Sequence, residues 1–116
     1  MQVPVTFVRT VKEEPLVKIL AIEQELPGMT AADLTPALKK AEAARAWELY
    51  QAGVVRELYF RQDYPGAVLI LECANVAEAK ELLNTLPLVK DGLITFDIIP
   101  LLPYPGFARL FAAETQ

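Results

Sequence analysis

The sequence predicts a single α+β domain with the ferredoxin-like order of elements, strand, helix, strand, strand, helix, strand (βαββαβ). Three observations support this prediction. Two helical patterns begin at recognisable N-caps, two strand patterns are joined by a short turn containing Pro and Gly, and one further strand pattern stands at each end. We therefore expect an antiparallel sheet with both helices on one face. A chain of 116 residues is long enough for one domain, which we place over residues 1–116 with its core over residues 16–102.

The first strand and the first helix have clear boundaries. The run "LVKILAIEQEL" over residues 16–26 is rich in aliphatic residues and stops at Pro27 and Gly28. A helix of about 18 residues follows, because Thr35 is a good N-cap, Pro36 suits the first helical position and Gly53 is a typical residue just past a helix end. The side chains expected on its inward face are Leu34, Leu38, Ala41, Arg45, Leu49 and Ala52.

A hairpin, a second helix and a last strand complete the pattern. The strand patterns "VVRELYFRQ" and "AVLILEC" flank the turn sequence "DYPG". Asn75 is the expected N-cap of the helix "VAEAKELLNTL", which Pro87 should end. The last strand runs from about residue 93 to residue 102, where Pro100 and Pro103 should prevent further strand pairing at its exposed end.

Both faces of the predicted sheet are mostly apolar. In the last strand one face carries Ile94, Phe96 and Ile98, and the other carries Leu93, Thr95, Asp97, Ile99 and Leu101. In the hairpin, Ala67, Leu69, Leu71 and Cys73 alternate with Val68, Ile70 and Glu72. Helices can cover only one of these faces. We therefore expect two copies to pack their sheets face to face across a dimer interface and to enclose a shared, partly polar cavity.

Two terminal segments lie outside this core. Residues 1–14 are an additional segment, for which an edge strand is one interpretation. The tail over residues 103–116 contains four large apolar side chains, Tyr104, Phe107, Leu110 and Phe111. Because such a tail would be poorly soluble in isolation, we expect it to pack on a neighbouring subunit.

Composition excludes several classes of partner and site. With 15 acidic against 11 basic residues the net charge is −4, which argues against nucleic acid or an anionic membrane surface as a partner. The absence of a membrane-spanning run and of a signal peptide predicts a cytoplasmic protein. The chain has no histidine and one cysteine, Cys73, which we interpret as a core residue. We expect neither a metal nor an organic cofactor.

Two stretches resemble the muconolactone isomerase-like family of dimeric α+β barrel proteins. They are "NVAEAKELLNTLPL", whose most specific part spans residues 76–88, and "WELYQAGVVRELY", whose most specific part spans residues 53–58. The resemblance covers roughly residues 16–102. It implies a ferredoxin-like protomer, dimers or an assembly of dimers, and a pocket between the helices and the shared barrel that moves a proton around an unsaturated lactone without a cofactor. The segment "VKDG" after Leu-Pro-Leu departs from the family, which suggests a different substrate pocket.

Glu72 and Asp97 are the predicted catalytic residues. Without histidine, the base of a proton-transferring isomerase must be a carboxylate, a lysine or a tyrosine. Both carboxylates occupy otherwise apolar strands on the expected barrel-facing side, where desolvation would raise a carboxyl pKa. The alternative is structural: Glu72 lies at a strand end in solvent, and Asp97 pairs with an arginine.

Tyr59, Arg61 and Arg45 are the predicted substrate-binding residues. Tyr59 and Arg61 should share a strand face with Val55 and Glu57, and could hold an anionic substrate or form an ordinary exposed face. Arg45 interrupts an apolar helix stripe, so its guanidinium either reaches solvent or pairs with a carboxylate on the same helix.

Two functions therefore remain open from the sequence. One is a cofactor-free isomerase that acts on a small unsaturated acid or lactone by carboxylate-mediated proton transfer. The other is a non-catalytic module of the same architecture that binds a small apolar molecule or only assembles with itself. A cavity lined by convergent polar groups would favour the enzyme.

Overall fold

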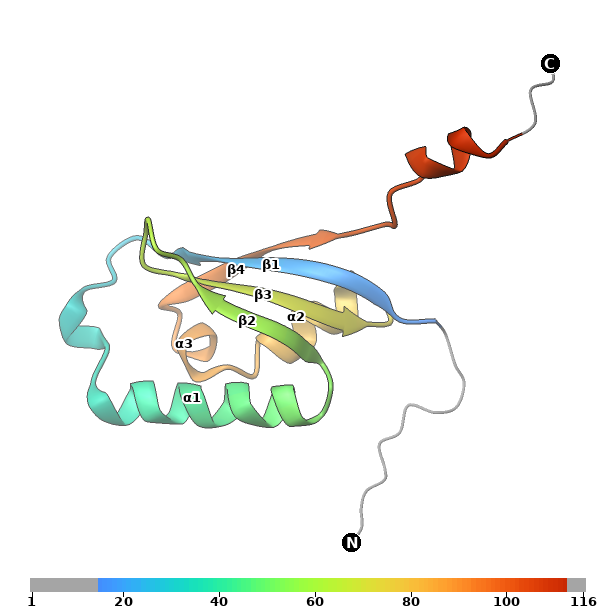
Figure 1. Cartoon of the computed structure of the whole chain (residues 1–116). Helices are drawn as coiled ribbons and strands as arrows, with labels where there is room; N and C mark the ends of the chain where they lie inside the picture. Colours follow the sequence, from blue (N-terminus) through green and yellow to red (C-terminus); the bar gives the residue numbers. More distant parts are fainter. Residues whose placement is uncertain (1–14, 113–116) are drawn as a thin grey trace, which may run out of the picture.

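Over the residues that the structure describes, the chain forms a four-stranded antiparallel sheet with the α-helices on one face (Figure 1). The computed structural model describes residues 15–112, so the additional segment predicted over residues 1–14 lies outside the described range. The strand order β2-β3-β1-β4 is that of the ferredoxin-like fold, which confirms the predicted fold class. The elements are β1 (Val17–Glu25), η1 (Ala31–Asp33), α1 (Pro36–Gln51), β2 (Val55–Phe60), β3 (Ala67–Cys73), α2 (Val76–Leu83), α3 (Pro87–Lys90), β4 (Ile94–Pro100) and η2 (Gly106–Leu110).

The predicted helix starts are confirmed by side-chain caps. Thr35 Oγ1 accepts a hydrogen bond of 3.1 Å from the N–H of Leu38, and Pro36 is the first residue of α1. Asn75 Oδ1 accepts a hydrogen bond of 2.8 Å from the N–H of Glu78 at the start of α2. No helix within residues 15–112 is long and apolar enough to cross a membrane.

The short helix α3 was not predicted. Pro87 was expected only to end the second helix, but α2 stops at Leu83 and Pro87 begins α3. Proline has no N–H to lose in the first turn of a helix, so the same residue that cannot continue one helix is suited to begin another. This corner places Leu88 against α1, where it contributes to the site described below.

The core lies between the sheet and the helices. Its fully buried side chains come from β1, β2, β3, α2 and β4, and include Ile19, Val55, Leu71, Cys73, Leu83 and Ile94. The interpretation of Cys73 as a core residue is therefore confirmed.

The inward face of α1 differs in part from the prediction. Leu49 is buried as expected, but Ala41 and Ala52 are exposed, whereas Glu42 and Ala46 are partly buried. The inward face of α1 is therefore centred on Glu42, Ala46 and Leu49, and not on Ala41 and Ala52. The prediction missed this face because Glu42 is charged and was not expected to be buried.

The opposite face of the sheet is uncovered by any element in the described part of the chain (Figure 1). The strand registers place Leu20 and Ile22 of β1 beside Ile70 and Val68 of β3, with Ile99 of β4 on the other side of Leu20. This group of five aliphatic side chains is the open apolar face. Beyond β4 the chain leaves the body of the protein, and η2 stands clear of the sheet.

Candidate active site

A cavity of about 550 Å³ lies where β1 and β2 end and β3 and β4 begin, between that end of the sheet and α1. This volume is in the ordinary range for a small-molecule site. Its walls are largely apolar, and the apolar side chains that line it include Met29, Leu34, Leu58, Phe60, Leu88 and Ile94.

Glu23 of β1 is a half-buried carboxylate in this cavity. It follows the buried residues Ile19 and Ala21 on the helix-covered face, because alternate residues of a strand share a face. Its Oε1 accepts a hydrogen bond of 2.9 Å from the N–H of Ala67. Burial raises the pKa of Glu23, the bond from Ala67 opposes this rise, and the charge of Glu25 adds to it.

Glu42 of α1 faces the same cavity from the helical side. Its Oε1 accepts a hydrogen bond of 2.9 Å from the N–H of Leu88, near the start of α3. Burial is the main cause that raises the pKa of Glu42, the bond from Leu88 opposes it, and the negative charge of Glu23 raises it further. The charge of Glu23 therefore favours the protonated form of Glu42.

Glu25 and Lys39 are further charged residues of the cavity wall. Lys39 is exposed and makes no ion pair within residues 15–112, so its ammonium group is available to an anion that enters the cavity. Two half-buried carboxylates with raised pKa values are stronger bases towards a bound molecule than ordinary surface carboxylates.

Glu72 and Asp97, the predicted catalytic residues, lie outside this cavity on the open sheet face. Glu72 lies opposite Lys18 on the neighbouring strand and approaches it to 3.5 Å, with Arg56 at 3.9 Å. Asp97 is exposed and accepts a hydrogen bond of 3.0 Å from Gln24. The expected face is correct for both residues, but Asp97 bonds to an amide and not to an arginine. Their catalytic roles stay predictions.

Tyr59 is the only one of the five predicted site residues that lines the cavity, and its hydroxyl donates a hydrogen bond of 2.9 Å to Glu57. The prediction that Tyr59 shares a strand face with Val55 is wrong. The register with β3 shifts between Val55 and Glu57, so Val55 faces the core, whereas Glu57 and Tyr59 pair with residues of the open face. Such an irregularity changes the alternation of side chains along a strand.

Arg61 does not line the cavity. Its guanidinium makes two hydrogen bonds to the carboxylate of Asp63, of 3.0 and 2.9 Å, and lies 5.0 Å from the ring centre of Tyr64. These contacts close the turn between β2 and β3. Its predicted substrate-binding role stays a prediction.

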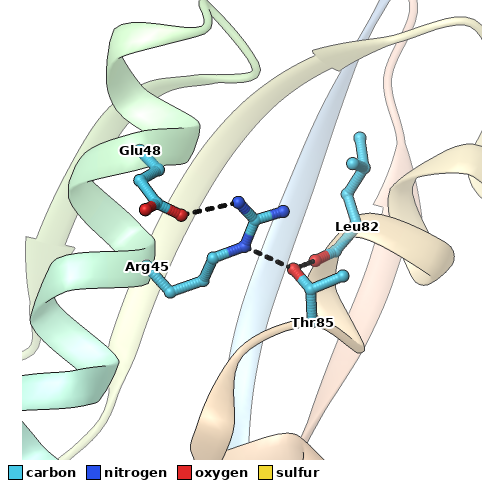
Figure 2. A network of polar contacts seen from close by, with 4 residues as sticks. All are labelled: Arg45, Glu48, Leu82 and Thr85. Atoms are coloured by element: carbon cyan, nitrogen blue, oxygen red, sulfur yellow. Dashed lines mark hydrogen bonds and ion pairs between the residues drawn. The ribbon is translucent and has the colours of Figure 1, made fainter.

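Arg45 connects α1 to the corner between α2 and α3 (Figure 2). Its Nε donates a hydrogen bond of 2.8 Å to Thr85 Oγ1, and its Nη1 bonds to Glu48 at 2.8 Å. The Thr85 hydroxyl in turn donates to the carbonyl oxygen of Leu82. The predicted alternative of a partner on the same helix is therefore correct, and Arg45 has an additional partner on a second helix.

Comparison with protein families matches residues 19–106 to the model of muconolactone delta-isomerase. The chain belongs to the muconolactone delta-isomerase family. A comparison with curated proteins finds no match. The range that matches the family model contains every residue that lines the cavity, including Glu23 and Glu42.

Sequence reasoning missed Glu23 and Glu42, the two half-buried carboxylates that this family member carries in its cavity. The alternation in "ILAIE" contained the signal for Glu23, because it places Glu23 on the same face as Ile19 and Ala21. Glu42 lies four residues after Leu38, which is helical spacing for a shared face.

Within residues 15–112, no group of three or more acidic, cysteine or histidine side chains is arranged to hold a metal ion.

We expect the Glu42→Gln variant to be more stable than the unmodified chain at pH 7. The folded-state pKa of Glu42 is raised, so its contribution to stability is fully present below its ordinary pKa of 4.5 and is lost as pH rises through the folded-state value. The gain should therefore be small but measurable at pH 7 and absent at pH 4, as followed by thermal unfolding. The exposed Glu81→Gln change is the control. An equal gain in both variants would contradict the effect of burial.

Proposed function

We propose that this protein is a cofactor-free isomerase that moves a proton within a small unsaturated lactone or acid, with Glu23 as the base. The observation that carries the proposal is the apolar cavity with two half-buried carboxylates, both with raised pKa values, in a member of the muconolactone delta-isomerase family. A surface carboxylate is a weak base for carbon acids, and desolvation strengthens it.

The two carboxylates would have different roles. We assign the retained proton to Glu42, because the negative charge of Glu23 raises the pKa of Glu42. Glu23 would then take a proton from a carbon next to the unsaturated carbonyl system and return it to another carbon, so that the double bond migrates and no atom is gained or lost. Protonated Glu42 would donate a hydrogen bond to the enolate oxygen that forms in between.

Lys39 would bind an anionic group of the substrate. It is the positively charged side chain of the cavity wall, and it has no ion-pair partner within residues 15–112. A substrate with a carboxylate beside the lactone ring would place this group towards the exposed lysine and the ring against the apolar walls.

Incubation in heavy water with a series of small unsaturated γ-lactones, with and without a carboxymethyl group, tests the function. We expect proton NMR to show double-bond migration and deuterium at the exchanging carbon for at least one carboxymethyl lactone. A folded protein that catalyses neither migration nor exchange in the whole series would instead be the non-catalytic binding module.

We also propose that two copies pair through the open apolar face. Light scattering at micromolar concentration should give the mass of a dimer or of a multiple of dimers. The Ile70→Glu variant should shift the mass towards the monomer, because it places a charge among Leu20, Ile22 and Val68. The matched control is Lys80→Glu on α2, away from this face. A monomeric mass for the unmodified chain would contradict the pairing.

The C-terminal tail stays a predicted contact with a neighbouring subunit. Its side chains Tyr104, Phe107, Leu110 and Phe111 are 67–83% exposed in the single chain, and Tyr104 and Phe107 pack on each other in an edge-to-face pair. Deletion of residues 107–116 should lower the melting temperature or change the assembly mass. An unchanged melting temperature and an unchanged mass would show that the tail makes no such contact.

A further inference from the structure

The turn between β2 and β3 lies directly against Glu23. The N–H of Ala67, the first residue of β3, donates the 2.9 Å hydrogen bond to the Glu23 carboxylate. The preceding residue, Gly66, is buried, and a Cβ atom at its position would lie 3.7 Å from Glu23 Cβ and 3.6 Å from the Glu23 carbonyl oxygen. Gly66 and Ala67 therefore form the binding position of the Glu23 carboxylate.

Arg61 closes the turn 61–66, which ends next to Ala67. Its backbone N–H donates a hydrogen bond of 2.8 Å to the carbonyl oxygen of Gly66. Its side chain binds both carboxylate oxygens of Asp63 and stacks over the ring of Tyr64. The single residue Arg61 thus connects three points of the turn 61–66, and one of them is the residue immediately before Ala67.

We propose that Arg61 is a positioning residue for Glu23, because it closes the turn 61–66 and so holds the Ala67 N–H in place against the Glu23 carboxylate. Arg61 itself contacts neither the cavity nor Glu23. An effect of Arg61 on catalysis rests on the proposed role of Glu23 as the base. The effect of Arg61 on the hydrogen bond between Ala67 and Glu23 can be measured in the protein without substrate.

The hydrogen bond from Ala67 has an electrostatic consequence. It lowers the pKa of Glu23, against the opposite effects of burial and of Glu25. The other titratable side chains that share the cavity are Lys39 and Glu42 on α1 and Tyr59 on β2. Loosening the turn should weaken the bond from Ala67 and leave these groups unchanged, so that Glu23 becomes harder to ionise.

Carboxyl-carbon NMR titration of the full chain, labelled at glutamate, tests this inference without a substrate. In Arg61→Met the titration midpoint of Glu23 should move to higher pH, and the midpoint of Glu42 should move less because its amide donor is Leu88. Arg61→Lys keeps the charge but not the two-point contact with Asp63, and should give an intermediate midpoint.

Two further variants complete the design. Ala67→Pro removes the N–H itself, at the first position of a strand where proline is tolerated, and should give the largest shift. Arg56→Met is the matched control, because Arg56 is a second arginine of the same hairpin, on β2, that pairs with a carboxylate, Glu72, but does not touch the turn.

The inference is overturned if Glu23 titrates at the same pH in Arg61→Met and in the unmodified chain, or if Ala67→Pro leaves its midpoint unchanged. If Arg61→Met does not fold, Asp63→Asn, which weakens the same contact from its other side, replaces it with the same expected direction. Because the titration needs no substrate, an inactive protein would refute the proposed function and leave the positioning result in place.

Discussion

The Glu23→Gln variant is expected to lose isomerase activity by roughly 100- to 10,000-fold in kcat/KM, the usual contribution of a positioned general base. Glutamine has almost the same shape, and its amide oxygen can still accept the hydrogen bond from the Ala67 N–H. The fold should therefore persist, and the loss should reflect the missing proton acceptor. Kinetics with the best lactone substrate, together with circular dichroism, would measure both properties.

The matched control for this variant is Glu25→Gln. Glu25 also lines the cavity, but it is exposed and lies at the end of β1. We expect a change of less than about 10-fold, because its role is limited to the electrostatic effect on Glu23. Equal losses in the two variants would contradict the assignment of Glu23 as the base.

The Leu71→Ala variant should show the largest loss of stability, about 3 kcal/mol in the free energy of unfolding, within the range for a buried leucine. Leu71 lies on the inner strand β3, is fully buried, and pairs with Ile19 and Val55 of the two neighbouring strands. Removing three carbon atoms there leaves a cavity that the sheet cannot close. Denaturant unfolding at a fixed protein concentration would measure this effect.

Leu16→Ala is the control for the core variant. Leu16 precedes β1 and is 47% exposed, so its truncation should cost less than about 1 kcal/mol. A loss at Leu71 no larger than the loss at Leu16 would contradict the described core.

Much of the fold could be predicted because local signals agreed with each other. Thr35, Asn75 and the "DYPG" turn each define a boundary through a specific backbone interaction, and the structure confirms all three. The helix α3 could not be predicted in the same way. Pro87 is compatible both with the end of one helix and with the start of another, and only tertiary packing decides between them.

The site was harder to predict than the fold. Their position in apolar strands suggested Glu72 and Asp97, but both side chains lie on the open sheet face, whereas the cavity lies on the helix-covered face. Glu23 and Glu42 come from a strand and a helix with different side-chain periodicities, and they meet only when α1 packs on the sheet. The register shift near Val55 reversed the expected face of Tyr59, and a single extra residue in a strand leaves no clear mark in the sequence.

The most direct test of the central claim is a crystal structure of the protein with a saturated carboxymethyl lactone, which can bind but has no double bond to move. We predict that the ring lies in the cavity between β1 and α1, within hydrogen-bond distance of Glu23 and Glu42, with its carboxylate towards Lys39. A ligand bound instead on the open sheet face, beside Asp97 or Glu72, would contradict this account and would restore the two carboxylates that the sequence first suggested.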